Sequence, residues 1–85
     1  MTNITIYTTR LCPYCFAAKK ILAAKELSFD EIDVTGDMEG RAKMTERAGG
    51  VRTVPQIFVG ETHVGGFTEL HFADQSGELD RLISQ

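Results

Sequence analysis

The sequence predicts an α/β fold in which a mixed four-stranded sheet carries helices on both faces. Short segments that alternate apolar and polar residues are interleaved with segments of helical periodicity, in the order β-α-β-α-β-β-α with a short final helix. A helix between the first two strands predicts that these strands are parallel. Gly60-Glu61 between the last two strands predicts a type II′ turn and an antiparallel hairpin. The 85 residues correspond in length to one domain, 1–85.

The first half of the chain supplies two strands and two helices. Ile4 to Thr8 alternates apolar and polar residues and is rich in β-branched side chains, which is typical of a strand. A helix is predicted from Pro13 to about Glu26, because proline suits the first helical turn, where its missing N–H costs nothing. Phe29 to Val34 is predicted as the second strand, and Met38 to Ala48 as the second helix.

The second half supplies the hairpin and the last helices. Gln56–Val59 and Thr62–Val64 are the two predicted strands of the hairpin. We expect Thr68 to cap the helix that follows the hairpin. Ser76-Gly77 then interrupts the helical pattern, and Leu79 to Ile83 is predicted as a short final helix.

Composition and charge exclude several classes of partner. The formal net charge is −3 and no basic stripe is present, which argues against nucleic acid. No apolar run approaches the ~20 residues that span a bilayer, so no membrane partner is expected. Met1 to Thr5 lacks a basic stretch followed by an apolar one, so we expect no secretory signal and a cytoplasmic, reducing location. The sequence shows no large apolar patch, which favours a monomer.

The only two cysteines lie in Cys12-Pro13-Tyr14-Cys15, at the start of the first predicted helix. A thiol at a helix N-terminus faces unpaired backbone N–H groups and the positive end of the helix dipole, and both favour the thiolate. We therefore expect Cys12 to have a pKa well below the free value of about 8.5 and to act as a nucleophile. Cys15, one turn further on, can attack a mixed disulfide formed by Cys12. In a reducing compartment such a pair indicates catalysis rather than structure.

Three motifs in a fixed order give the chain a resemblance to a known family. Cys12-Pro13-Tyr14-Cys15 follows the first strand, Thr53-Val54-Pro55 precedes the third strand, and Gly65-Gly66 precedes a helix. With these motifs the chain resembles the glutaredoxins, small enzymes of the thioredoxin-like fold, over nearly its full length. The absence of Trp and the single strand before the cysteines separate it from thioredoxins proper. The resemblance implies a single glutaredoxin domain, 1–85.

The resemblance implies a glutathione-dependent thiol-disulfide oxidoreductase with two routes. In the dithiol route, Cys12 attacks a protein disulfide and Cys15 resolves the intermediate. In the monothiol route, Cys12 takes glutathione from a glutathionylated protein, and a second glutathione regenerates the thiol. The implied partners are glutathione and client proteins that carry disulfides or glutathionylated cysteines. Glutathione is expected as a reducing co-substrate, with no covalently bound cofactor and no metal ion.

The resemblance also implies a glutathione site around the cysteines. Pro55 is expected in cis, which turns the Val54 backbone toward the cysteinyl part of glutathione. The helix N-terminus after Gly65-Gly66 is expected to receive the γ-glutamyl carboxylate, and Arg10 or Arg52 the glycyl carboxylate. The implied glutathione contacts are Tyr14, Thr53, Val54, Pro55, Gly66, Phe67, Thr68, Arg10 and Arg52.

Other interpretations of the same residues remain open. The chain can be a redoxin that is reduced by thioredoxin reductase instead of glutathione. It can also be a carrier of an iron–sulfur cluster that is ligated by two chains together with glutathione. Within one chain, His63 and His71 show no ligand spacing with the cysteine pair, so no zinc site is expected. His63 is predicted as a surface or hydrogen-bonded histidine, and Lys19 and Lys20 as part of a solvated helix face.

Overall fold

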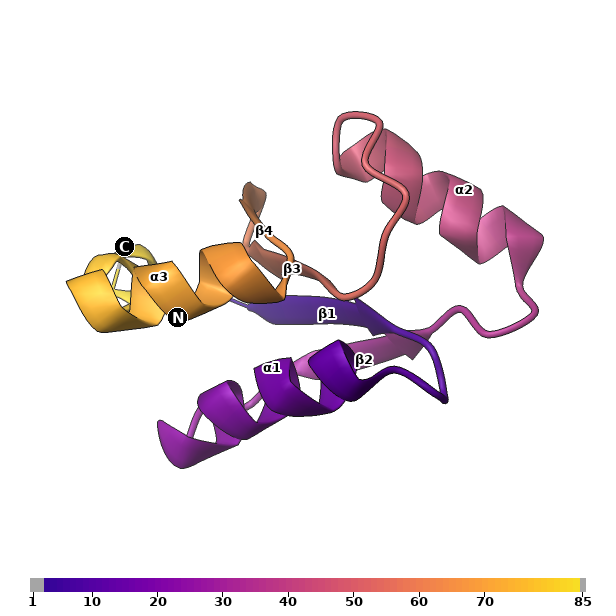
Figure 1. Ribbon diagram of the computed structural model, residues 1–85. Helices are drawn as coiled ribbons and strands as arrows, with labels where there is room; N and C mark the ends of the chain where they lie inside the picture. Colours follow the sequence, from indigo (N-terminus) through magenta and orange to yellow (C-terminus); the bar gives the residue numbers. More distant parts are fainter. Residues whose placement is uncertain (1–2, 85) are drawn as a thin grey trace.

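The computed structural model describes residues 3–84, in which four strands and four helices follow one another in the predicted order (Figure 1). In chain order they are β1 (Ile4–Thr8), α1 (Pro13–Ala24), β2 (Asp30–Asp33), α2 (Met38–Arg47), β3 (Gln56–Val59), β4 (Thr62–Gly65), α3 (Phe67–Ser76) and α4 (Glu78–Ile83). None of the helices described within residues 3–84 combines the length and the apolarity that crossing a membrane requires.

The four strands form one mixed sheet in the order β2-β1-β3-β4. β1 and β2 are parallel, with Ile6 opposite Glu31, whereas β3 is antiparallel to both of its neighbours. In the hairpin turn, Gly60 has a φ of 60° whereas Glu61 is not among the residues with positive φ, as a type II′ turn requires. The predicted mixed sheet of a thioredoxin-like fold is therefore confirmed.

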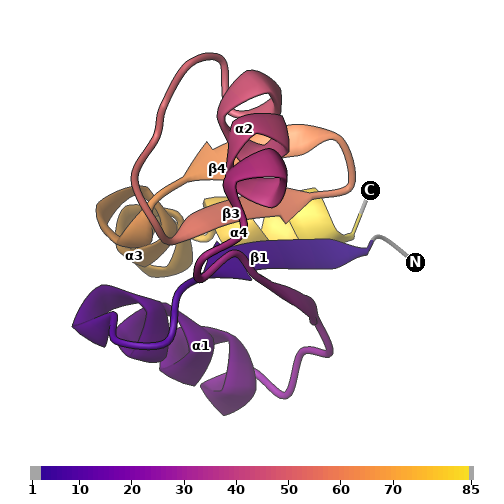
Figure 2. The ribbon, with the colours of Figure 1, turned by 90° about the vertical axis from the view of Figure 1, so that its right-hand side faces the viewer.

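The sheet separates two apolar cores, because successive strand side chains point to opposite faces. Figure 2 shows α2 on one side of the sheet and α1 on the other. On the α1 side, Ile57 packs with Leu22 of α1 and with Leu70 of α3. On the α2 side, its neighbour Phe58 packs with Met44 of α2. Helices therefore cover both faces of the sheet, as predicted. The first residues of α1 and α3 lie at one end of the sheet, where they can contribute to a site.

Two helix boundaries differ from the prediction by more than one residue. The N-cap of α3 is Gly66, so the prediction that Thr68 caps this helix is wrong. Glu69 Oε1 accepts the Gly66 N–H at 2.7 Å, because a glutamate at the third helical position can reach back to the N-cap amide. Helix α1 ends before Glu26, whose φ of 58° is left-handed and cannot continue the helix.

Candidate functional site

Both cysteines lie at the N-terminus of α1. Cys12 is the N-cap in an extended conformation, and Pro13 is the first helical residue. Cys12 Sγ accepts the Cys15 backbone N–H at 3.1 Å, one of the amides that have no partner within the helix. The two sulfurs are joined in a disulfide, and the Cα atoms are 5.2 Å apart. Cys12 is 8% exposed and Cys15 is 1% exposed, so Cys12 is the more accessible cysteine.

The loop before β3 approaches this disulfide from the other end of the sequence. The Val54–Pro55 peptide bond is cis, which confirms the prediction for Pro55. The carbonyl oxygen of Val54 lies 3.9 Å from Cys12 Sγ. Among the described residues 3–84, the Val54 N–H has no backbone hydrogen-bond partner. The backbone of Val54 is therefore available to pair with an extended segment beside the cysteines.

A hollow of about 200 Å³, here called the groove, opens between this loop and the first residues of α1 and α3. The groove is lined by Tyr14, Thr53, Val54, Pro55, Gly66, Phe67, Thr68 and Glu69. These are all of the predicted glutathione contacts except the two arginines, together with one further residue, Glu69. The N-terminus of α3 therefore faces the same hollow as the free backbone of Val54, although the two segments are separate in sequence.

Two aromatic rings form an apolar wall of the groove. Tyr14 is 63% exposed, and the centroid of its ring lies 5.6 Å from that of Phe67. The planes of the two rings are inclined by 39°. Such a pair offers apolar area at the mouth of the groove, while the backbone of the Val54 loop offers polar atoms within it.

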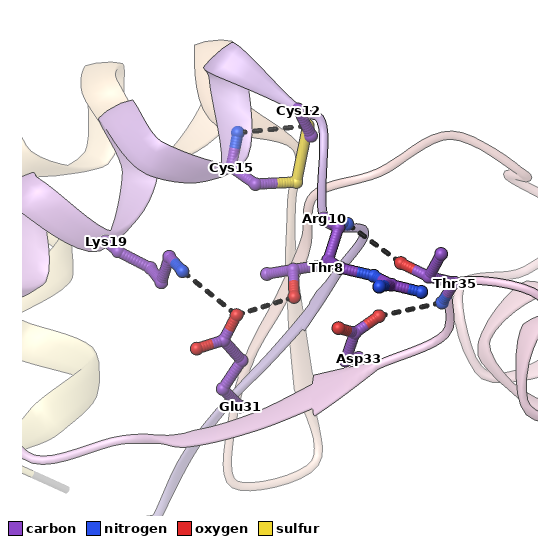
Figure 3. A network of polar contacts seen from close by, with 8 residues as sticks. All are labelled: Thr8, Arg10, Cys12, Cys15, Lys19, Glu31, Asp33 and Thr35. Atoms are coloured by element: carbon purple, nitrogen blue, oxygen red, sulfur yellow. Dashed lines mark hydrogen bonds and ion pairs between the residues drawn. A yellow bond between two sulfur atoms is a disulfide. The ribbon is translucent and has the colours of Figure 1, made fainter.

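A second set of polar groups lies beside the disulfide, between α1 and β2 (Figure 3). The buried Thr8 hydroxyl donates to Glu31 Oε2 at 2.7 Å, and Lys19 Nζ lies 3.0 Å from the same oxygen. The Thr8 hydroxyl and then the Lys19 ammonium hold the pKa of Glu31 below its ordinary value. Thr8, Lys19 and Glu31 are here called the charged flank. Lys20 is exposed as predicted, whereas the Lys19 side chain is only 26% exposed because it pairs with Glu31.

The two predicted cations do not line the groove. The Arg10 backbone N–H donates to Thr35 Oγ1 at 2.8 Å, and Figure 3 shows the Arg10 side chain beside Thr35 and Asp33. Hydrogen bonds from Thr35, with a smaller effect of the Arg10 charge, hold the pKa of Asp33 below its ordinary value. Arg52 lines a separate hollow of about 900 Å³ along α2, where its carbonyl accepts a hydrogen bond from Arg41 at 3.1 Å.

The sequence motifs do not single out two residues that shape the groove. Glu69 lines it and holds the Gly66 amide, and its signal in the sequence is a glutamate three residues after the Gly66 N-cap. Gln56 is 1% exposed and directly follows Pro55, and its signal is a polar residue at the start of an otherwise apolar strand. Both residues act through the backbone of the groove, which single-residue motifs do not reveal.

The chemistry that this arrangement supports is thiol–disulfide exchange. One sulfur is partly accessible and receives a helix N-terminal amide, and the second lies behind it within bonding distance. Attack by a thiolate on a disulfide sulfur requires only these two groups and access for the substrate. Within residues 3–84, no group of three or more His, Cys, Asp or Glu side chains is placed to hold a metal ion.

Comparisons with known proteins agree with this chemistry. The family model named Glutaredoxin matches residues 4–64. The chain is 49% identical to a glutaredoxin from Pseudomonas aeruginosa over 84 residues, which cover 99% of each chain. It is 43% identical to glutaredoxin 3 from Escherichia coli over 83 residues, 98% of this chain and 99% of that one. The solution structure of glutaredoxin from Brucella melitensis superposes with a TM-score of 0.85 and 47% identity, over 98% of this chain and 89% of that one.

Proposed function

Because this chain belongs to the glutaredoxin family of thiol-disulfide oxidoreductases, we propose that glutathione supplies its electrons and binds in the groove. The observation that carries this proposal is the convergence of three kinds of contact beside Cys12. The Val54 backbone can pair with an extended peptide, the N-terminus of α3 suits a carboxylate, and Tyr14 and Phe67 offer apolar area. Glutathione, a short peptide with a central cysteine and a carboxylate near each end, can use all of these contacts at once.

In the proposed dithiol route, the Cys12 thiolate attacks one sulfur of a client disulfide. The client's other sulfur leaves as a thiolate, and a mixed disulfide joins Cys12 to the client. Cys15 then attacks Cys12 Sγ and releases the second client sulfur, which leaves the protein with the Cys12–Cys15 disulfide seen in the structure. One glutathione attacks Cys12 and releases Cys15. A second glutathione attacks the sulfur of the first, which releases oxidised glutathione and the Cys12 thiolate.

In the proposed monothiol route, the mixed disulfide forms directly. The Cys12 thiolate attacks the glutathione sulfur of a glutathionylated protein and releases that protein as a thiol. A second glutathione then attacks the bound one, so Cys15 is not needed. We propose Tyr14, Thr53, Val54, Pro55, Gly66, Phe67 and Thr68 as contacts of the bound glutathione. For the glycyl carboxylate, Arg10 or Arg52 has to extend to the mouth of the groove.

The two cysteine variants test the proposal in an assay coupled to glutathione reductase. We expect Cys12→Ser to abolish turnover of both a protein disulfide and a glutathionylated peptide, because it removes the attacking sulfur. We expect Cys15→Ser to retain turnover of the glutathionylated peptide and to lose reduction of the protein disulfide. Equal losses for the two variants with both substrates contradict these roles.

Two further measurements separate the proposal from the two other interpretations. A redoxin of the thioredoxin type is reduced faster by thioredoxin reductase than by glutathione with its reductase. A cluster carrier becomes coloured after anaerobic reconstitution with iron, sulfide and glutathione, and has no turnover with disulfides. We further propose that the chain acts as a monomeric single domain over residues 1–85 in the cytoplasm. In the cytoplasm, the glutathione pool returns Cys12 and Cys15 to the reduced, thiol state after each turnover.

A further inference from the structure

Gln56 is a buried amide whose hydrogen bonds end at the groove. Its side chain is 1% exposed, and its Nε2 lies 3.0 Å from the Thr53 carbonyl oxygen and 3.3 Å from Thr53 Oγ1. A carbonyl oxygen can only accept, so the atom of Gln56 that faces it must be the NH₂ group. Thr53 is thereby bound at both its backbone and its side chain by the residue that begins β3.

The opposite end of the same amide contacts His63. Gln56 Oε1 lies 2.6 Å from His63 Nε2. Since the NH₂ group of Gln56 is directed at Thr53, Oε1 is an acceptor and His63 Nε2 must carry the proton. A chain of hydrogen bonds with one fixed direction therefore runs from His63 through Gln56 to Thr53.

The hairpin turn fixes the position of His63. The pairing of β3 with β4 shifts between Ile57 and Phe58, so that Ile57 lies opposite Gly65 but Phe58 lies opposite His63. Val59 pairs with Thr62 across the two-residue turn, and Phe58 lies opposite His63 on the turn side of this shift, so His63 shares the face of Phe58 and Gln56. The His63 ring also stacks on Phe58, with centroids 4.9 Å apart and an angle of 28° between the planes. The imidazole is thus fixed by the strand, the stack and the hydrogen bond.

We infer that Gln56 and His63 are positioning residues that hold the Thr53–Val54 backbone in the shape that the substrate needs. This inference rests on the proposed binding of glutathione in the groove. Thr53 lines the groove, and it also lines a neighbouring hollow of about 380 Å³ that reaches Gln56 and His63. Thr53 itself is exposed, and both its carbonyl oxygen and its hydroxyl lie within hydrogen-bond distance of Gln56 Nε2. A fixed loop binds a substrate more tightly, because less conformational freedom is lost on binding.

The matched test uses Gln56→Met, which keeps the length of the side chain and removes both hydrogen bonds to Thr53. We expect the KM for a glutathionylated peptide to rise about tenfold, with kcat unchanged, since one to two hydrogen bonds order the loop. His63→Phe keeps the ring on Phe58 and removes only the hydrogen bond to Gln56, and we expect about a threefold rise. Thr62→Val, on the same hairpin, is the control and leaves KM unchanged.

A measurement without glutathione separates this inference from the function on which it rests. NMR order parameters of the oxidised protein report the rigidity of the Thr53 and Val54 amides directly. We expect Gln56→Met to lower both order parameters and to leave those of β2 unchanged. Unchanged order parameters in Gln56→Met overturn the inference, and so does a KM that rises equally in Thr62→Val. A wild-type protein without glutathione turnover overturns the proposed function instead, while the order parameters still decide the role of Gln56.

Discussion

Two buried polar side chains lie at the same end of neighbouring strands, near the disulfide, and they form hydrogen bonds to different kinds of group. Thr8 ends β1 and Gln56 begins β3, and both are 1% exposed. Thr8 donates to the carboxylate of Glu31, which pairs with the ammonium of Lys19. Gln56 joins the neutral groups of Thr53 and His63. Thr8 is thus hydrogen-bonded to the charged flank, whereas Gln56 is hydrogen-bonded to the backbone of the groove.

The difference between the two sides follows from how far each interaction acts. Charges act over several ångströms, so a carboxylate and an ammonium near a sulfur change the stability of its thiolate without contact. Neutral hydrogen bonds act only on the atoms that they join. The charged flank is therefore suited to set the balance between thiolate and disulfide, and the groove side is suited to set the shape that a substrate meets. Each of the following predictions tests one side of this comparison.

The largest effect is expected on the groove side, at Gly65. Its φ of 125° is unfavourable for any other residue, and an added Cβ would lie 2.7 Å from Glu69 Cγ. We expect Gly65→Ala to reduce the free energy of unfolding by about 3 kcal/mol, because strain and overlap add. Glu69 must also move away from the Gly66 amide that it holds. Urea denaturation measures the loss.

The control for this substitution is Gly36, which has the left-handed φ of 68° but no neighbouring atom within 4 Å of an added Cβ. We expect Gly36→Ala to cost about 1 kcal/mol, since only the backbone conformation is disfavoured. Equal losses for the two alanine variants would show that the close packing of Glu69 against Gly65 contributes nothing to the groove.

The next effect is expected on the charged flank, at Thr8. Thr8→Val keeps the shape of the side chain but removes the hydroxyl that donates to Glu31, and we expect a loss of about 1.5 kcal/mol in the free energy of unfolding. Thr45→Val is the matched control, because the Thr45 hydroxyl donates only to the Arg41 carbonyl within α2. A loss of the same size in both variants would contradict a special role for the bond to a charged acceptor.

Hydrophobic periodicity was sufficient to predict most of the fold. The alternation in Ile4–Thr8 and the glycine at position 60 predict the first strand and the hairpin without any tertiary information, and both are confirmed. The Thr53-Val54-Pro55 motif likewise predicts the cis peptide bond and the position of the loop beside Cys12. These features depend on neighbours in the sequence or on a motif that is continuous in it.

The remaining features depend on contacts that only the folded chain creates. Lys19 and Glu31 meet because α1 packs over the parallel pair β1 and β2, and nothing in either local segment indicates a partner. His63 shares a face with Gln56 because the two-residue turn pairs Val59 with Thr62 and Phe58 with His63, and the hydrogen bond between the two side chains forms only in the folded hairpin. Thr68 resembles a cap by residue type, but the glutamate that follows it holds the N-cap amide instead.

The third prediction concerns the redox balance of the disulfide. Glu31→Gln removes a negative charge beside the cysteines, and Lys19→Gln removes a positive one. We expect the first to stabilise the thiolate and raise the reduction potential, and the second to lower it. We expect each substitution to change the equilibrium constant for reduction of the disulfide by glutathione about threefold. This corresponds to a shift of about 14 mV in the reduction potential of a two-electron couple.

The sign of these shifts separates an electrostatic role from a structural one. Equilibration of each variant with glutathione buffers measures the potential, and the double variant should return close to the wild-type value. Asp30→Asn is the control, because it removes the same charge from the same strand but from the opposite face of the sheet. Shifts of the same sign in Glu31→Gln and Lys19→Gln would contradict a direct effect of charge on the sulfur.

The smallest effect is the dependence of stability on pH that Glu31 creates. Its pKa in the folded protein lies below the ordinary value of 4.5, so the folded state favours the ionised form. The resulting stabilisation is complete above the pKa of the unfolded chain and is lost as the pH falls through the folded pKa. Because the Glu31 side chain is 37% exposed, solvent limits this contribution to about 0.5 kcal/mol. The difference in unfolding free energy between wild type and Glu31→Gln should therefore be constant near neutrality and shrink below about pH 4.5, as measured by urea denaturation. A difference that grows toward acid pH would mean that the folded state favours the protonated carboxyl group, which would contradict a stabilising ion pair between Glu31 and Lys19.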